Sequence, residues 1–84
     1  MTLRERHCDI EKVAASAVQV ANVYHYMGDY DQAYLYYYQS LGIYEDLGDR
    51  QGMAAAYSNL GLVDVEREQF KNAEKNFIES LTYN

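Results

Sequence analysis

The sequence has little of several residue types, and each scarcity excludes a class of protein. It contains no proline, no tryptophan and one cysteine, so no internal disulfide forms, and we expect a cytoplasmic protein in a reducing compartment. No apolar run approaches the roughly 18 residues of a membrane helix, and the polar N-terminus lacks the apolar core of a signal peptide. Lys and Arg number 7 against 13 Asp and Glu, a net charge of −6, so neither nucleic acid nor a membrane surface is expected as a partner.

The remaining composition is that of one small globular domain. The chain has 84 residues, of which 49% are hydrophobic and 24% charged. A core of this size is only marginally self-sufficient, so contacts with other chains or repeats are expected to contribute.

An internal repeat of 40 residues is visible when residues 14–44 are aligned with 54–84. The identical pairs are Ala14/Ala54, Ala15/Ala55, Val23/Val63, Ala33/Ala73, Ser40/Ser80 and Leu41/Leu81. The conservative pairs are Val20/Leu60, Ala21/Gly61, Tyr30/Phe70 and Tyr37/Phe77. Because the matches fall mostly on apolar or small positions at helical spacing, they indicate a duplicated helical unit.

Helical periodicity continues through both halves, and two Gly-Asp pairs, at 28–29 and 48–49, interrupt it. Glycine accepts the left-handed conformation that ends a helix, and the aspartate after it can cap the next helix. The pattern predicts helices at about 10–27, 30–47, 50–67 and 70–82. Loops of two or three residues make neighbouring helices antiparallel, which gives two hairpins. The boundary at 68–69 has no glycine and is the least defined.

The first residues admit two interpretations. Residues 2–5, Thr-Leu-Arg-Glu, have the spacing of a capping box and could begin a longer first helix. By the 40-residue period, residues 1–9 instead correspond to 41–49, the tail of a hairpin, as in a piece of a longer array. We therefore divide the chain into 1–13, an N-terminal extension or the end of a preceding repeat, and two repeats, 14–53 and 54–84.

Both repeats resemble the tetratricopeptide repeat. The signature of that repeat begins with an aromatic residue, which is followed after two residues by Leu-Gly and after two more by Tyr. An Ala comes later, with an aromatic residue four positions after it. The second repeat shows Tyr57, Leu60, Gly61, Ala73 and Phe77, and the first shows Val20, Ala21, Tyr24, Ala33 and Tyr37. The resemblance implies an all-α fold in which two antiparallel helix-turn-helix hairpins, four helices in all, stack as a short right-handed α-solenoid. It also implies a protein–protein interaction scaffold.

The second repeat departs from the signature in places. Asp64 stands where Tyr24 would repeat, and Glu68 replaces the turn glycine. The period is 40 rather than 34, and residues 47–52 resemble the linker of the 40-residue class found in kinesin light chains and spindle-orientation adaptors.

In this family the first helix of each hairpin lines a concave groove that holds a peptide segment. Carried over residue by residue, the lining comprises Ala15, Val18, Asn22, His25, Tyr26, Ala55, Ser58, Asn59, Leu62, Val65 and Glu66. Chaperone-binding members grip a C-terminal carboxylate with lysines, asparagines and an arginine. Asn22 and Asn59 match that clamp, but Val18 replaces its first lysine, so an acidic segment is not expected. The groove favours an apolar, aromatic or basic peptide.

Self-association is the alternative function. Eight of the 10 tyrosines lie between residues 24 and 44, more than the repeat core needs, and the candidates for an oligomer interface are Tyr34, Tyr36, Tyr38 and Tyr44. No polar capping helix follows the last repeat, so Phe77, Ile78, Leu81 and Tyr83 are expected to leave a partly apolar face open. A homodimer through that open end would make the chain a structural, self-associating module.

Catalysis, metal binding and cofactor binding are not expected. His7, Cys8 and Asp9 look like the base, nucleophile and orienting carboxylate of a catalytic triad. Adjacent residues point in different directions, however, and a triad needs side chains that converge. His25 is the one other histidine, and the segment 29–31 lacks the remaining ligands of a calcium loop. A weaker third hypothesis is a regulatory fragment that binds a small hydrophobic ligand between its hairpins.

Overall fold

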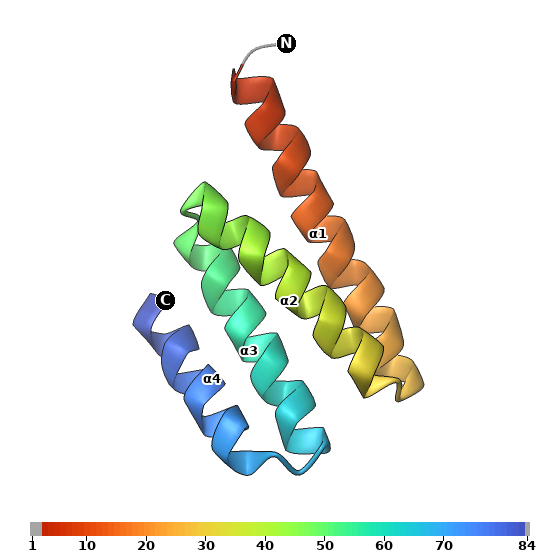
Figure 1. The fold of residues 1–84 in the computed structure, drawn as a ribbon. Coiled ribbons are helices and arrows are strands. Elements are labelled where there is room, and N and C mark those ends of the chain that lie inside the picture. Colours follow the sequence, from red (N-terminus) through yellow and green to blue (C-terminus); the bar gives the residue numbers. More distant parts are fainter. Residues whose placement is uncertain (1–2, 84) are drawn as a thin grey trace.

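The computed structural model describes the backbone of residues 3–83 and the side chains of residues 9–83. Within that part the chain forms four helices in sequence: α1 (Leu3–Met27), α2 (Tyr30–Leu47), α3 (Arg50–Glu66) and α4 (Phe70–Tyr83). Each helix packs against the next, α1 on α2, α2 on α3 and α3 on α4 (Figure 1). The all-α fold of two stacked antiparallel hairpins is therefore confirmed, and the expected bounds of α2, α3 and α4 hold to within one residue.

The start of the first helix differs from the predicted residue 10. Helix α1 is continuous from Leu3 and has 25 residues, seven more than the 18 of α2. The longer of the two alternatives for its start is the one observed, although Thr2 of the capping-box segment lies outside the described residues. Residues 9–13 of α1 are all exposed, because α2 is too short to cover them.

Three turns of the same geometry recur every 20 residues. Gly28, Gly48 and Glu68 take the left-handed conformation, with φ of 83°, 68° and 62°. The backbone amide after each of them donates to a carbonyl five residues earlier: Asp29 to Tyr24 (2.9 Å), Asp49 to Tyr44 (3.0 Å) and Gln69 to Asp64 (2.8 Å). The boundary without glycine is thus built like the other two, and Glu68 adopts a conformation that glycine favours.

Aspartates cap the two middle helices, as expected. Asp29 accepts a hydrogen bond from the amide of Gln32 (3.3 Å) at the start of α2. Asp49 accepts one from the amide of Gly52 (3.0 Å) at the start of α3. Each carboxylate therefore satisfies an amide that has no partner within its helix.

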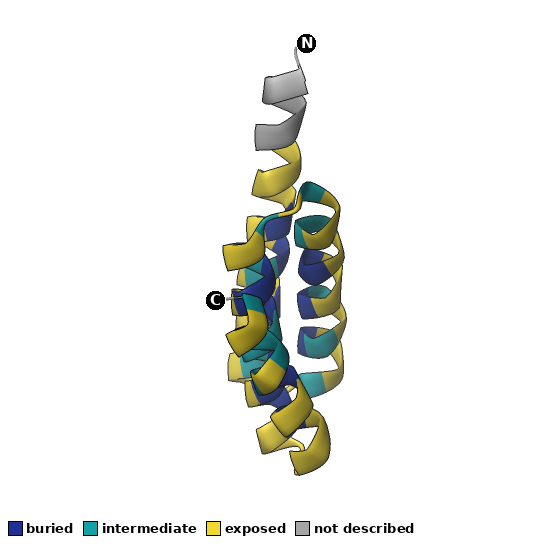
Figure 2. Ribbon diagram, turned by 90° about the vertical axis from the view of Figure 1, so that its left-hand side faces the viewer, coloured by how far each residue is buried: buried dark blue, intermediate teal, exposed yellow. Residues whose placement is uncertain are grey.

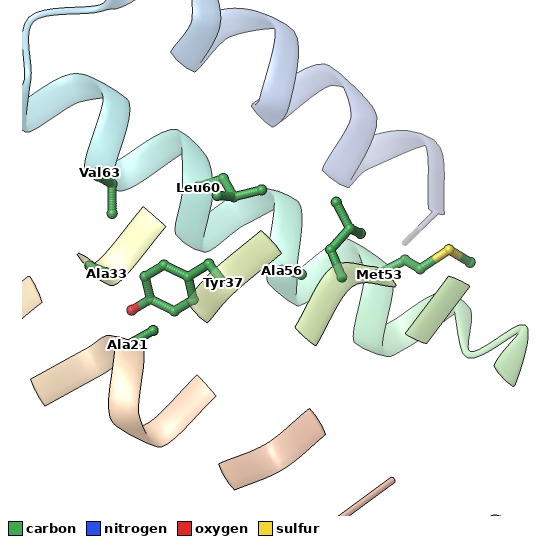
Figure 3. Packing of buried hydrophobic residues seen from close by; sticks show 8 residues of the cluster. Ala21, Ala33, Tyr37, Met53, Ala56, Leu60 and Val63 are labelled. Carbon is green, nitrogen blue, oxygen red and sulfur yellow. The ribbon is translucent and has the colours of Figure 1, made fainter. Parts of the chain in front are cut away.

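The core lies along the contacts between successive helices. Figure 2 shows the buried residues where helices face one another and exposed residues along their outer sides. Figure 3 shows the Tyr37 ring of α2 between Ala21 of α1 and the buried side of α3. The buried cluster comprises Ala21, Ala33, Tyr37, Leu41, Met53, Ala56, Leu60 and Val63. The small residues let the helices approach closely, and the Tyr37 ring fills the space beside them.

Two glycines of α3 lie directly under aromatic rings. Tyr44 of α2 covers Gly52, and Phe77 of α4 covers Gly61. A Cβ atom added at Gly61 would lie only 2.7 Å from Cε1 of Phe77. Both glycines therefore allow a helix to pack more closely on α3 than any side chain would permit.

Candidate functional site

A cleft of about 410 Å³ opens between the C-terminal ends of α1 and α3. Its lining consists of Asn22, His25, Tyr26, Tyr30 and Glu66. We call it the α1–α3 cleft. Four of these residues are among those expected from the family groove. Tyr30, the first residue of α2 and the repeat equivalent of Phe70, was not among them. Tyr30 packs against the core and also lines the cleft.

Glu66 is the electrostatic centre of the α1–α3 cleft. Its Oε2 lies 2.9 Å from Nε2 of His25, and its side chain remains 44% exposed. Hydrogen bonding to Glu66, together with the negative charge of that carboxylate, raises the pKa of Tyr30. Burial, and then the same charge, raises the pKa of Tyr37 beneath the cleft. The carboxylate at the end of α3 therefore interacts with groups from α1 and α2, while its side chain stays partly exposed to water.

A hydrogen bond from the core fixes the side chain of Asn22 in the α1–α3 cleft. The buried hydroxyl of Tyr37 donates a hydrogen bond to Oδ1 of Asn22, which leaves the amide nitrogen of Asn22 available to a ligand. Tyr26 is 95% exposed and forms an outer edge of the cleft. The cleft thus combines a fixed amide, an open carboxylate and an exposed aromatic ring.

The remaining residues expected in the groove lie outside the α1–α3 cleft. Val18 is half-buried against the core. Ser58 lines a separate shallow hollow beside α4, together with Ala55, and Asn59 is half-buried. Leu62 and Val65 are 47% and 41% exposed, so α3 presents apolar side chains near Glu66. The groove carried over from the family is therefore polar at the α1–α3 cleft and apolar along α3.

The tyrosines proposed for an oligomer interface differ in their exposure. Tyr36 stacks on Tyr24 with ring centroids 5.7 Å apart, and Tyr44 packs on Gly52. Tyr34 meets Tyr38 edge to face at 4.9 Å. Of the four candidates Tyr38 is exposed, at 48%, while the others are half-buried. Most of these rings therefore contribute to packing within the chain.

A second cleft, of about 560 Å³, lies between α2 and α4, in the region between the hairpins where the third hypothesis placed a small hydrophobic ligand. Its lining comprises Tyr34, Tyr38, Leu41, Glu45, Tyr57, Asn72, Lys75, Asn76 and Glu79. Burial, with contributions from the neighbouring Tyr38 and Asp64, raises the pKa of Tyr34 to about 12. The lining carries charges of both signs, so this α2–α4 cleft has no clear preference for an anion or a cation.

The residues of α4 that were expected to form an open apolar face differ in their exposure. Ile78 and Leu81 are 53% and 73% exposed. Phe77 is half-buried over Gly61, and Tyr83 stacks on Tyr57 with centroids 5.8 Å apart. The outward-facing part of this face is therefore aliphatic rather than aromatic.

The side chains of His7 and Cys8 lie outside the described residues, and Asp9 is exposed. Among the side chains of residues 9–83, no three His, Cys, Asp or Glu groups gather as they would around a metal ion. Within residues 3–83, no helix combines the length and apolar character needed to cross a bilayer.

Comparison with known protein families gives one match. The family model described as tetratricopeptide repeat matches residues 12–83, nearly the whole chain. The match spans both hairpins and the three repeated turns. No curated protein and no solved structure matches the chain.

Proposed function

Since the chain belongs to the tetratricopeptide repeat family of protein-interaction modules, we propose that its α1–α3 cleft binds an extended segment of a partner protein, with a Lys or Arg side chain directed at Glu66. The family match confirms the resemblance drawn from the signature residues. The open carboxylate of Glu66 at the centre of the cleft is the observation that carries the proposal.

A basic anchor suits the charges of the cleft. Glu66 is the acidic group in its lining, and the lining includes no Lys or Arg. The nearest cation in sequence, Arg67, points to α2, where it lies 3.5 Å from Asp31 and 5.5 Å from the Tyr34 ring centre. A guanidinium or ammonium group could therefore pair with Glu66 and lie against the Tyr26 ring.

The rest of the segment would run along α3. Leu62 and Val65 are half exposed there and offer an aliphatic surface for apolar or aromatic side chains. The amide nitrogen of Asn22 can donate to a backbone carbonyl of the segment. An acidic segment would face Glu66 without a cation to receive it, which supports the preference for basic and apolar sequences.

The family is typically a non-catalytic scaffold, and we extend that role to this chain. The proposed scaffold acts without a cofactor and in the cytoplasm, where its single cysteine would stay reduced. In that role, peptide binding at the α1–α3 cleft would hold one partner protein close to other proteins that the scaffold binds.

The test is fluorescence anisotropy with a matched pair of labelled peptides. Both carry alternating apolar residues, and they differ only in a central Arg or Glu. We expect the Arg peptide to bind more tightly, and Glu66→Gln to weaken it about tenfold, the loss of one charge-assisted contact. Tyr26→Ala should also weaken the Arg peptide.

Asp46→Asn is the matched control. It removes one negative charge from the exposed side of α2, away from the cleft, and should leave binding unchanged. Equal binding of the Arg and Glu peptides, or an unaltered affinity in Glu66→Gln, would contradict the proposal.

A further inference from the structure

The outer side of α1 carries a row of exposed apolar residues that the sequence reasoning did not anticipate. Val13, Val20 and Val23 are 58%, 39% and 58% exposed. Their spacing places them on one side of the helix. We call these three residues the α1 face.

The 40-residue repeat shows what covers such a row inside the chain. The equivalents of Val13, Val20 and Val23 are Met53, Leu60 and Val63 of α3. These equivalents are only 8%, 0% and 0% exposed, because α2 packs on them. The α1 face is thus one half of a helix contact that no other helix within residues 3–83 completes.

The other half of that contact lies at the opposite end of the molecule. On α2 the residues that pack on α3 include Tyr37 and Leu41, which are 1% and 4% exposed. Their equivalents on α4 are Phe77, which is half-buried, and Leu81, which is 73% exposed. We call Phe77 and Leu81 the α4 face.

From these two faces we infer that copies of this chain associate head to tail, with the α4 face of one copy packed on the α1 face of the next. The contact would repeat the α2–α3 contact within the chain, in which the equivalent side chains already fit one another. Leu81 would take the place of Leu41, and Val20 the place of Leu60. The occupant of each face is a second copy because one molecule carries both matching halves.

This arrangement differs from a symmetric dimer. A two-fold contact pairs a surface with itself, whereas here two different faces pair. A complex of any number of copies then keeps one open α1 face at one end and one open α4 face at the other. Mass should therefore grow with concentration rather than stop at two chains. The net charge of −6 on each copy opposes association, so added salt should promote it.

The test is sedimentation equilibrium of the 84-residue chain from low to high micromolar concentration, with two charged variants. Leu81→Glu blocks the α4 face and Val20→Glu blocks the α1 face. Each variant alone lacks one half of the contact, so we expect it to be a folded monomer. An equimolar mixture retains one intact pair of faces and should form a complex of two chains that grows no further.

Ile78→Glu is the matched control on the same helix. Ile78 is exposed, but so is its equivalent Tyr38, at 48%, so the repeated contact does not bury this position. Ile78→Glu should associate like the parent chain. Glu66→Gln should do so too, which separates this inference from peptide binding at the α1–α3 cleft.

Two results would overturn the inference. If the parent chain stays monomeric up to high micromolar concentration, the two faces do not bind a second copy, and flanking repeats or another protein would cover them. Dimers of Val20→Glu alone would indicate a symmetric contact through α4. Circular dichroism confirms the fold of each variant, and Leu81→Ser with Val20→Ser replace the charged pair if helicity is lost.

Discussion

Asn76 donates a hydrogen bond of 2.6 Å to the buried carboxylate of Asp64, and this pair occupies the place that the stacked rings of Tyr24 and Tyr36 occupy in the first hairpin. Both residues of the polar pair lie 40 positions after their aromatic equivalents. The departure of Asp64 from the repeat signature is therefore matched by a second replacement at position 76. The buried carboxylate loses water but keeps a donor.

Stability should depend on pH through Asp64. Burial raises the pKa of Asp64, against smaller opposite effects of Asn76 and Arg67. The folded chain thus holds this proton more tightly than the unfolded chain, so the contribution of Asp64 to stability is complete below the ordinary carboxyl pKa and is lost as pH rises through the raised pKa.

Asp64→Asn tests this dependence, since it keeps an acceptor for Asn76 and removes the charge. We expect the variant to be more stable than the parent in urea at neutral pH and to lose that advantage in acid. Asp46→Asn on the exposed side of α2 is the control. A constant difference between variant and parent across the pH range would contradict the raised pKa.

Replacing Asn76 alone should lower the free energy of unfolding more than replacing both Asn76 and Asp64. Asn76→Leu leaves the Asp64 carboxylate buried without its partner, and we expect a loss of about 2 kcal/mol in the free energy of unfolding at neutral pH. The double variant with Asp64→Leu removes both polar groups and should recover part of that loss. Urea unfolding of the two variants checks this, and a double variant less stable than Asn76→Leu would disprove it.

Two helical glycines should respond to alanine with opposite signs. At Gly61 the new Cβ would meet the Phe77 ring at 2.7 Å, so Gly61→Ala should destabilise the fold by about 1–3 kcal/mol. Gly42 has no atom within 4 Å of such a Cβ, and Gly42→Ala should stabilise α2 by about 0.5–1 kcal/mol. Thermal unfolding compares the two. If the two alanine substitutions changed the stability equally, the Phe77 ring would be able to move aside at no cost in free energy.

Glycine at position 68, in the third turn, should make the fold more stable. Glu68 holds a left-handed φ of 62°, a conformation that costs a residue with a Cβ about 1–2 kcal/mol. Glu68→Gly should therefore raise the free energy of unfolding by about 1 kcal/mol, after the greater freedom of glycine in the unfolded chain is counted. Glu68→Ala, which keeps the Cβ, is the control and should gain much less.

The helices and turns followed from the sequence because their signals are local. Gly28 and Gly48 interrupt an apolar period and mark two turns directly. The third turn was harder to place, since the same backbone geometry is held there by Glu68. The start of α1 stayed open because a capping sequence and the repeat period pointed to different positions.

The site was harder to predict, because it depends on which side chains meet across helices. Asn22, His25 and Tyr26 could be assigned from their spacing on one helix, but their meeting with Glu66 depends on how α1 and α3 lie together. Tyr30 was not expected in the site, because the sequence showed it only as the repeat equivalent of the apolar Phe70. The α1 face was missed because the expectation of an open end was applied only to the last helix.

The order of packing also determines where the fold can open first. Within residues 3–83, helices α2 and α3 each pack closely against two other helices, whereas α1 and α4 each pack closely against one. Opening an outer helix breaks one helix contact, but opening an inner helix breaks two. Amide hydrogens should consequently exchange fastest in α1 and α4 and slowest in α2 and α3, so that local unfolding proceeds inward from both ends of the chain. Covering either end would slow exchange on that side alone.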